Sequence, residues 1–451
     1  MKNNYIKSGM LALGLALTLV SCDDFLDITP TGKVIATTAE EYRDLLTYEY
    51  KYFCKDRYMT DLRTDEIELT KSGTSSTDLD SYLDLWRWKD ENPSPTTVYF
   101  SWRTYYHSIY IANYIIEHKG SITNGSADEI SQLVGEAYMM RAYNHFLLVN
   151  LYAQPYTKCN PATTRGVPMM LAADVNAVPR SSSVEAIYKQ VLADLDEAAK
   201  YMKVEKWDIG MNYRFNAVSV DALRARTYLY MGEWQNAYDA AKKVVDAWPD
   251  LEDLTKSSSK LPDNYQSVEN IVALEAFSNN LSTVINNPST DFVNTLYWTG
   301  DQRKLRYFRS SGSGYILRKY DSDNNRCSFR SAEAYLTAAE ALVQLDNADD
   351  AIDMIKVLLA KRFSSSTRAN AEQKFSDVKD DKEKLLQMIY DERARELAFE
   401  GQRWYDLRRT TQPQLTRIYE GEIFTLTSEK YTMMFPVDAV EANPEIELWE
   451  N

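Results

Sequence analysis

Three glutamates stand four residues apart near the end of the chain, and paired carboxylates are the groups that hydrolyse glycosidic bonds. Glu392, Glu396 and Glu400 would share one face of a helix. A glycosidase needs two such groups across a cleft, one with a raised pKa, and this spacing alone shows neither. Arg395 follows the first glutamate by three residues and Arg403 follows the last by three, within ion-pairing distance on a helix. The pattern favours an ion-pair network between the last helices, with a surface glycosidase as the remote alternative.

Other motifs of catalysis, phosphate binding or metal binding are not found in the sequence. The three histidines form no HExxH pair, and the chain has no GxGxxG, GxxxxGK[ST] or GxSxG segment. The stretch from Asp321 begins like an EF-hand loop, but Arg326 and Ala332 stand where that loop needs Gly and Glu. A looser calcium site in this acidic stretch stays open. We therefore predict no catalytic residue, no metal site and no cofactor.

Two stretches combine aromatic rings with polar side chains, and this combination is typical of sugar-binding sites. Apolar C–H faces of sugar rings lie on Trp and Tyr, while carboxylates, amides and guanidinium groups bind the hydroxyls. If the first stretch is extended, Trp86 and Trp88 point the same way. Alternatively, these aromatic side chains wedge the loops onto the helices. The predicted ligand-binding residues are Tyr82, Trp86, Arg87, Trp88 and Asn92 in the first stretch and Tyr297, Trp298, Arg303, Tyr307 and Tyr315 in the second.

Helices are the elements expected to position these stretches. Gly (15 residues) and Pro (13 residues) are scarce for 451 residues, which favours helix over sheet and turn. Residues 97–118 form one long helical candidate. Capping boxes at Ser126–Glu129 and Ser182–Glu185 start two more helices, which could pack antiparallel across the proline-containing loop 153–180. The helical period is lost over residues 251–328, apart from a predicted buried strand at 270–277.

A repeat signal further defines the helical part. Residues 232–249 resemble the second half of a tetratricopeptide repeat, with Gly232 ending the first helix and small alanines where two helices pack closely. Residues 345–362 align with this segment, although Asp346 stands at the glycine position. Helix pairs of this type bury their apolar faces by stacking on one another. We therefore predict a mainly α fold of about four helix pairs, with a loop-rich insertion and few short strands.

The overall charge excludes some functions. The formal net charge is −15 at pH 7. Because binding to nucleic acid or to anionic membrane surfaces depends on basic patches, this charge argues against both kinds of partner. Cys54, Cys159 and Cys327 are an odd number of cysteines beyond the leader, so they cannot all pair with one another. Whether any two of them pair stays open.

The first 22 residues resemble the leader of a bacterial lipoprotein. Two lysines precede an apolar stretch at 10–20, which is too short to span a bilayer as a helix. Residues 19–22, LVSC, resemble a lipobox, and cleavage before Cys22 would leave a cysteine for lipidation. The alternative is a plain secretory signal with a chance cysteine. The predicted organisation is a signal peptide at 1–21, a lipidated tether at 22–36 and one folded domain at 37–451.

Several sequence blocks, in order, resemble the SusD/RagB family. The block at 389–409 is the most specific, with Glu-Arg, Glu-Leu, Glu-Gly, Arg-Trp and Asp-Leu-Arg-Arg spaced as in that family. The C-terminal Phe435-Pro436-Val437 departs from the family's pattern, as does the tail that follows. The blocks are CDDFLDITP (22–30), SWRTYYHSIYIANYII (101–116), RAYNHFLLVNLYAQPY (141–156), AYLTAAEALVQL (334–345) and IYDERARELAFEGQRWYDLRR (389–409).

The resemblance implies a cell-surface lipoprotein, anchored in the bacterial outer membrane through Cys22, that binds a nutrient and has a SusC-like TonB-dependent transporter as its partner. The expected ligand is a glycan, with a peptide as the alternative, and no enzyme activity is expected. In this family the acidic turn that Arg63–Glu66 resembles contributes to the ligand site, which adds Asp65 to the predicted residues. Acids such as Asp23 and Asp24 resemble the signal that directs lipoproteins to the outer face of the membrane. The scaffold would comprise about 37–250 and 329–451, with the ligand-side insertion at about 251–328.

Overall fold

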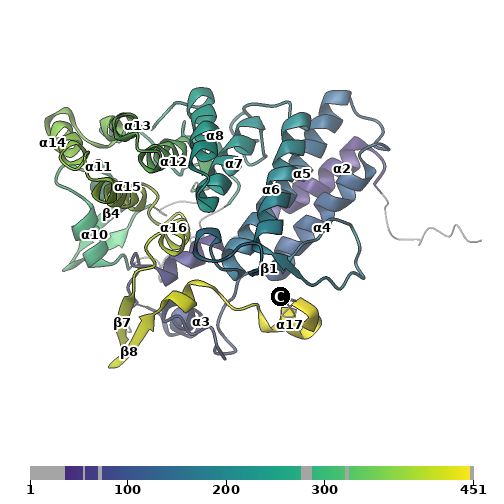
Figure 1. Cartoon of the computed structure of the whole chain (residues 1–451), viewed down its shortest axis with the longest axis horizontal. Helices are drawn as coiled ribbons and strands as arrows, with labels where there is room; N and C mark the ends of the chain where they lie inside the picture. The colour runs from purple at the N-terminus through teal and green to yellow at the C-terminus, as the bar shows by residue number, and fades with distance from the viewer. Residues whose placement is uncertain (1–35, 54–55, 70–73, 276–286, 320–324, 447–451) are drawn as a thin grey trace, which may run out of the picture.

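A row of helices forms the upper part of the molecule, and short elements lie along its lower edge (Figure 1). The computed structural model describes residues 36–53, 56–69, 74–275, 287–319 and 325–446. The predicted signal peptide, Cys22, the two acids after it and all but the last residue of the tether lie outside these ranges, as does Cys54. The first helices of the row are α2 (Ala39–Lys51), α4 (Trp102–His118), α5 (Ala127–Tyr152) and α6 (Val184–Tyr201).

Local sequence signals set the ends of these helices. The predicted capping box before α5 is present. The Ser126 hydroxyl accepts a hydrogen bond from the backbone N–H of Glu129, and the Glu129 carboxylate accepts one from the backbone N–H of Ser126. The second predicted capping box does not form, because Ser183 caps α6 and its hydroxyl accepts a hydrogen bond from the backbone N–H of Ala186, whose side chain has no group to bind back. Before α6, β2 (Ser181–Ser183) pairs with β1 (Arg165–Pro168). The helix predicted at 97–118 starts only at Trp102.

The repeat-like helix pairs confirm the mainly α fold. Helix α7 (Ala217–Met231) packs on α8 (Trp234–Ala247), and α12 (Ser331–Gln344) packs on α13 (Ala348–Arg362) and on α8. Gly232 ends α7 with φ of +75°, a left-handed conformation that glycine adopts without steric cost. Asp346 takes φ of +61° at the matching place after α12. The weaker repeat thus keeps the same turn without the glycine.

The last helices of the row are shorter than the sequence pattern predicts. The expected helix at 389–409 is divided into α15 (Lys382–Glu396) and α16 (Arg403–Arg409). In the turn between them Phe399 and Gly401 have φ of +60° and +62°. A Cβ on Gly401 would lie 2.9 Å from the carbonyl oxygen of Arg57, so this close approach requires glycine. Helix α14 (Ser365–Ser376) packs beside α13.

Short helices and two-stranded sheets make up the rest of the fold. The insertion contains two short helices that the sequence did not indicate, and of the strand expected at 270–277 the described residues 270–272 form β3 while 273–275 do not belong to it. These elements are η2 (Arg57–Arg63), α3 (Ser76–Trp86), η3 (Tyr156–Lys158), α10 (Thr290–Leu296), α11 (Gln302–Tyr307), η5 (Ser428–Tyr431), α17 (Val437–Ala442) and η6 (Pro444–Ile446). The antiparallel strand pairs, besides β1 with β2, are β3 (Asn270–Val272) with β6 (Phe329–Arg330), β4 (Phe308–Ser311) with β5 (Gly314–Leu317), and β7 (Leu415–Tyr419) with β8 (Glu422–Leu426).

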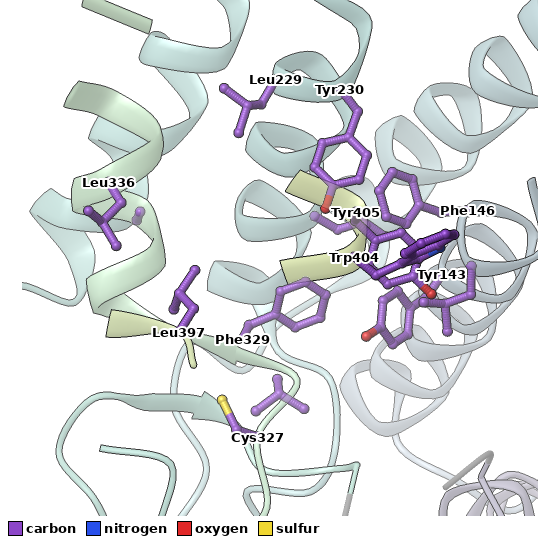
Figure 2. Close-up of a cluster of buried hydrophobic side chains, with 14 of the residues drawn as sticks. Tyr143, Phe146, Leu229, Tyr230, Cys327, Phe329, Leu336, Leu397, Trp404 and Tyr405 are labelled. Carbon is purple, nitrogen blue, oxygen red and sulfur yellow. The ribbon is translucent and has the colours of Figure 1, made fainter. Parts of the chain in front are cut away.

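One hydrophobic core runs through the molecule. Figure 2 shows Tyr143 and Phe146 of α5 facing Trp404 and Tyr405 of α16, with Phe329 close by. These side chains are at most 4% exposed. Helix α16, near the C-terminus, is therefore packed against α5 in the N-terminal half of the chain.

Candidate functional site

The two tryptophans of the first predicted stretch lie on either side of a buried guanidinium group. Trp86 is the last residue of α3 and Trp88 has φ of +58°, so the segment is not extended as the sequence suggested. The indole N–H of Trp86 donates to the carbonyl of Ile67 at 3.0 Å, and that of Trp88 donates to the carbonyl of Arg63 at 2.9 Å. The guanidinium carbon of Arg417 lies 4.5 Å from the first ring centroid and 4.2 Å from the second.

A cavity of about 360 Å³ opens beside this cluster, and we call it the acidic cavity. Its base includes Trp86, Phe292, Leu296 and Arg417, and its rim includes Asp65, Glu68, Asp291, Thr295 and Thr416. Backbone pairing joins the segments that form it, since Ser289 N donates to Glu66 O at 2.7 Å and Glu68 N donates to Asn287 O at 2.9 Å. Of the predicted ligand-binding residues, Asp65 and Trp86 line this cavity, and none of those predicted in the second stretch does.

The rim carboxylates differ in their partners. Burial raises the pKa of Glu68, and the nearby charge of Asp291 raises it further. Burial opposes ionisation of Asp65 as well, but Arg403 pairs with both of its oxygens at 2.8 and 2.9 Å and holds the pKa of Asp65 below its usual value. Glu68 and Asp291 remain exposed at the rim. Such a rim can accept hydrogen bonds from hydroxyl groups above an aromatic base.

A second cavity, of about 310 Å³, lies on the other side of the loop after α3, and we call it the apolar cavity. Leu85 and Phe100 line it together with residues of the C-terminal segment 433–441. Tyr99, Met434 and Val437 are 62%, 53% and 63% exposed around it. Large apolar side chains that are exposed together are typical of a binding surface.

The other residues predicted in the first stretch lie around this loop. Arg87 is partly exposed, pairs with Asp84 at 2.5 Å and covers the ring of Phe424 at 5.4 Å. Tyr82 is half-buried against the core, and Asn92 is exposed with φ of +47°. None of these three lines the acidic or the apolar cavity.

Most residues predicted in the second stretch have internal partners. The Tyr297 hydroxyl donates to the carbonyl of Arg395 at 2.8 Å. Partly exposed Trp298 packs on Phe363 and Phe375, and the guanidinium of Arg395 lies 4.1 Å from its ring. These contacts agree with the alternative that the aromatic residues wedge the insertion onto the helices.

The remaining three divide between the interior and the surface. Arg303 and Tyr307 are both 0% exposed, so they face the protein and not a ligand in this structure. Tyr315 is partly exposed on β5, where its hydroxyl donates to Asn294 at 2.6 Å.

The three spaced glutamates form the predicted ion-pair network. Glu396 contacts Arg303, Arg330 and Arg362 at 2.7 to 2.9 Å. Burial disfavours its charge, but these arginines hold the pKa of Glu396 well below its usual value, and the pKa values of the other two glutamates are also lowered. The expected pair of Glu400 with Arg403 does not form. Arg403 pairs with Asp65, and Glu400 binds Lys319 and Arg330. None of the three has the raised pKa that a glycosidase acid needs.

Several cavity residues were not anticipated from the sequence. Glu68, Asp291 and Thr295 are isolated polar residues, and Thr416 and Arg417 lie more than 300 residues after Trp86. Pairing between distant segments brings them together, and no local motif announces that pairing.

The described residues also bear on disulfides, metal sites and membrane-spanning helices. Cys159 and Cys327 are free thiols. Within the described ranges, no group of three or more His, Cys, Asp or Glu side chains is placed to hold a metal ion. Nor does any helix of those ranges combine the length and apolar character needed to cross a bilayer.

Known proteins resemble this chain in sequence and in fold. SusD-like protein P38 of Formosa agariphila is 23% identical over 484 residues, which cover 89% of this chain and 90% of that protein. A SusD superfamily structure from Bacteroides thetaiotaomicron superposes with a TM-score of 0.73 at 21% identity, covering 92% of this chain and all of that one. A laminarin-binding SusD-like protein superposes with a TM-score of 0.62 at 19% identity, covering 83% of this chain and 92% of that one.

Family models agree with these relatives. Residues 24–229 match a family described as starch-binding and associating with the outer membrane. Residues 198–444, more than half of the chain, match the SusD family model. The chain therefore belongs to the SusD family, as its sequence blocks indicated.

Proposed function

We propose that this protein binds an oligosaccharide at the surface of the outer membrane and delivers it to a TonB-dependent transporter, without hydrolysing it. The observation that carries the proposal is the acidic cavity, where exposed carboxylates and hydroxyls surround a base that includes Phe292, Leu296 and the largely buried Trp86. Hydroxyl-rich ligands with apolar ring faces suit such a lining. The laminarin-binding relative and the starch-binding family description support a glycan as the ligand class.

The state of the three spaced glutamates supports binding without hydrolysis. Glu392, Glu396 and Glu400 are at most 2% exposed and each pairs with buried basic side chains. Each of these three carboxylates is thus already engaged by a basic side chain. Lipid attachment at Cys22 would keep the protein at the membrane, and a TonB-dependent transporter as partner is the role that the sequence resemblance implies.

A peptide is the second candidate ligand, and the apolar cavity favours it. Tyr99, Met434 and Val437 offer exposed apolar contacts that fit side chains of an extended peptide better than sugar hydroxyls.

Titration calorimetry of the mature protein against neutral polysaccharides and mixed peptides tests the proposal. We expect binding to at least one glycan, and weaker binding by about tenfold when Glu68→Gln and Asp291→Asn are combined, because two acceptors of sugar hydroxyls lose their charge. Glu383→Gln, on the exposed first turn of α15, is the matched control and should change nothing. Binding to peptides alone would replace the glycan by the second candidate, and release of sugar products would contradict the absence of hydrolysis.

A further inference from the structure

The charged residues that line a third cavity differ in sign from those at the rim of the acidic cavity. It has a volume of about 650 Å³, and we call it the tyrosine pocket after Tyr50, Tyr213 and Tyr265 in its wall. The C-terminal end of α2, the segment 210–213 and the segment before and after β3 form it. None of the ligand-binding residues predicted from the sequence lines it.

Its charged lining consists of two cations. Among the described residues, Lys51 and Arg326 line the tyrosine pocket, and no described Asp or Glu does. Both side chains are exposed, and neither forms an ion pair with a described residue. Lys51 lies 5.0 Å above the ring of Tyr52. In a chain with a net charge of −15, two basic groups without a described acidic partner at one cavity favour an anion there.

The aromatic wall is rigidly held. The ring of Tyr213 packs against that of Tyr50 at 5.6 Å in an edge-on arrangement, and the Tyr50 hydroxyl donates to Glu136 at 2.8 Å. Asn212 fixes the opposite side, because its amide donates to the carbonyl of Tyr265 at 2.6 Å. Tyr213 and Tyr265 are only partly buried. The ring of Tyr213 is therefore placed in advance, which lowers the entropic cost of binding a flat ring.

The acidic cavity provides the contrast. Its rim includes three carboxylates, which accept hydrogen bonds from hydroxyls but repel negative charge. The two cavities thus favour different parts of a ligand, one neutral and one anionic.

We propose that the tyrosine pocket is a binding site for the anionic unit of an acidic saccharide, with Lys51 and Arg326 contacting its carboxylate or sulfate and Tyr213 and Tyr265 stacking on its ring. This inference rests on the proposed function, since it names a class of glycan that the protein captures. It adds a site and a charge preference that the acidic cavity does not supply.

Binding to three tetrasaccharides tests the inference. The probes are a neutral galactotetraose, a tetragalacturonate and a sulfated carrageenan tetrasaccharide, so the last two distinguish carboxylate from sulfate. We expect at least one anionic probe to bind more tightly than the neutral one, with an affinity that falls as salt is added. Lys51→Gln and Arg326→Gln should each weaken that binding by about tenfold, because a charged hydrogen bond is lost.

Arg309→Gln is the matched control, since Arg309 is exposed on β4 and lines none of the three cavities. Tyr213→Ala should weaken the same probe without changing the salt dependence. Anionic binding that survives both Lys51→Gln and Arg326→Gln overturns the inference, and so does binding of the neutral probe alone. The latter result leaves the proposed function standing, whereas binding of no glycan refutes both.

Discussion

Glu396 is the residue on which three buried arginines converge. Its two carboxylate oxygens accept hydrogen bonds from Arg303, Arg330 and Arg362, and its side chain is fully buried. Removing one partner from a buried ion-pair network leaves the other charges without compensation. Arg303 belongs to this network, although its residue type alone suggested contact with a ligand.

Substitution of Glu396 by Gln should lower the free energy of unfolding by about 3 kcal/mol, because three guanidinium groups lose one shared counter-charge. Urea unfolding followed by circular dichroism measures the change. Glu383→Gln, on the exposed side of the same helix, should alter stability by less than about 0.5 kcal/mol. Equal effects of the two substitutions would show that the network contributes nothing to stability.

At the scale of elements, a pair of buried acids joins η2 to the turn between α15 and α16. Asp61 accepts a hydrogen bond from Gly401 N at 3.0 Å, and Glu66 accepts one from Phe399 N at 3.1 Å. Burial raises the pKa of Asp61 to about 7, and burial with the nearby charge of Asp61 raises the pKa of Glu66 well above its usual value. The two carboxyl groups therefore retain protons at a pH where the unfolded chain has lost them.

This pair should make stability depend on pH. Because both pKa values are raised by folding, the stabilising contribution is complete below about pH 4 and is lost as the pH rises towards 7 and beyond. In Glu66→Gln, an amide that cannot ionise takes the place of the protonated acid. We expect the stability of this variant, relative to the original protein, to increase by about 1 kcal/mol or more between pH 5.5 and pH 8. Parallel urea profiles over this range would contradict the assignment.

At the scale of the whole molecule, two cavities lie beside α3 and a third, with basic lining residues, lies at the end of α2. Capture of a glycan for a transporter requires that this body stays at the membrane. The anchor that we propose, Cys22, lies outside the described residues, so only an experiment on cells tests it.

Replacing Cys22 by Ala should release the protein from the outer-membrane fraction, because the residue that would carry the acyl chains is gone. Fractionation and immunoblotting of intact cells measure the distribution, and protease treatment measures surface exposure. Cys159→Ala is the control, since Cys159 is a partly buried free thiol in the folded domain. Retention of Cys22→Ala at the membrane would refute lipid anchoring at this residue.

The sequence by itself determined the fold class and the family. Periodic apolar residues, the capping box at Ser126 and the repeat signal at Gly232 are local features, and local backbone preferences are enough to place helices. It also indicated that the spaced glutamates form ion pairs, but of the two expected helix neighbours Arg395 pairs with Glu392 whereas Arg403 pairs with Asp65.

Only the tertiary structure decided which residues line a cavity and which are buried. Arg303 and Trp88 have the chemistry of a ligand site, yet they are buried by residues that lie far away in the sequence. Conversely, Asp291 and Arg326 carry no local signal and become cavity residues through their neighbours in space. Burial depends on packing between distant segments, and a periodic pattern contains no record of which distant segments meet.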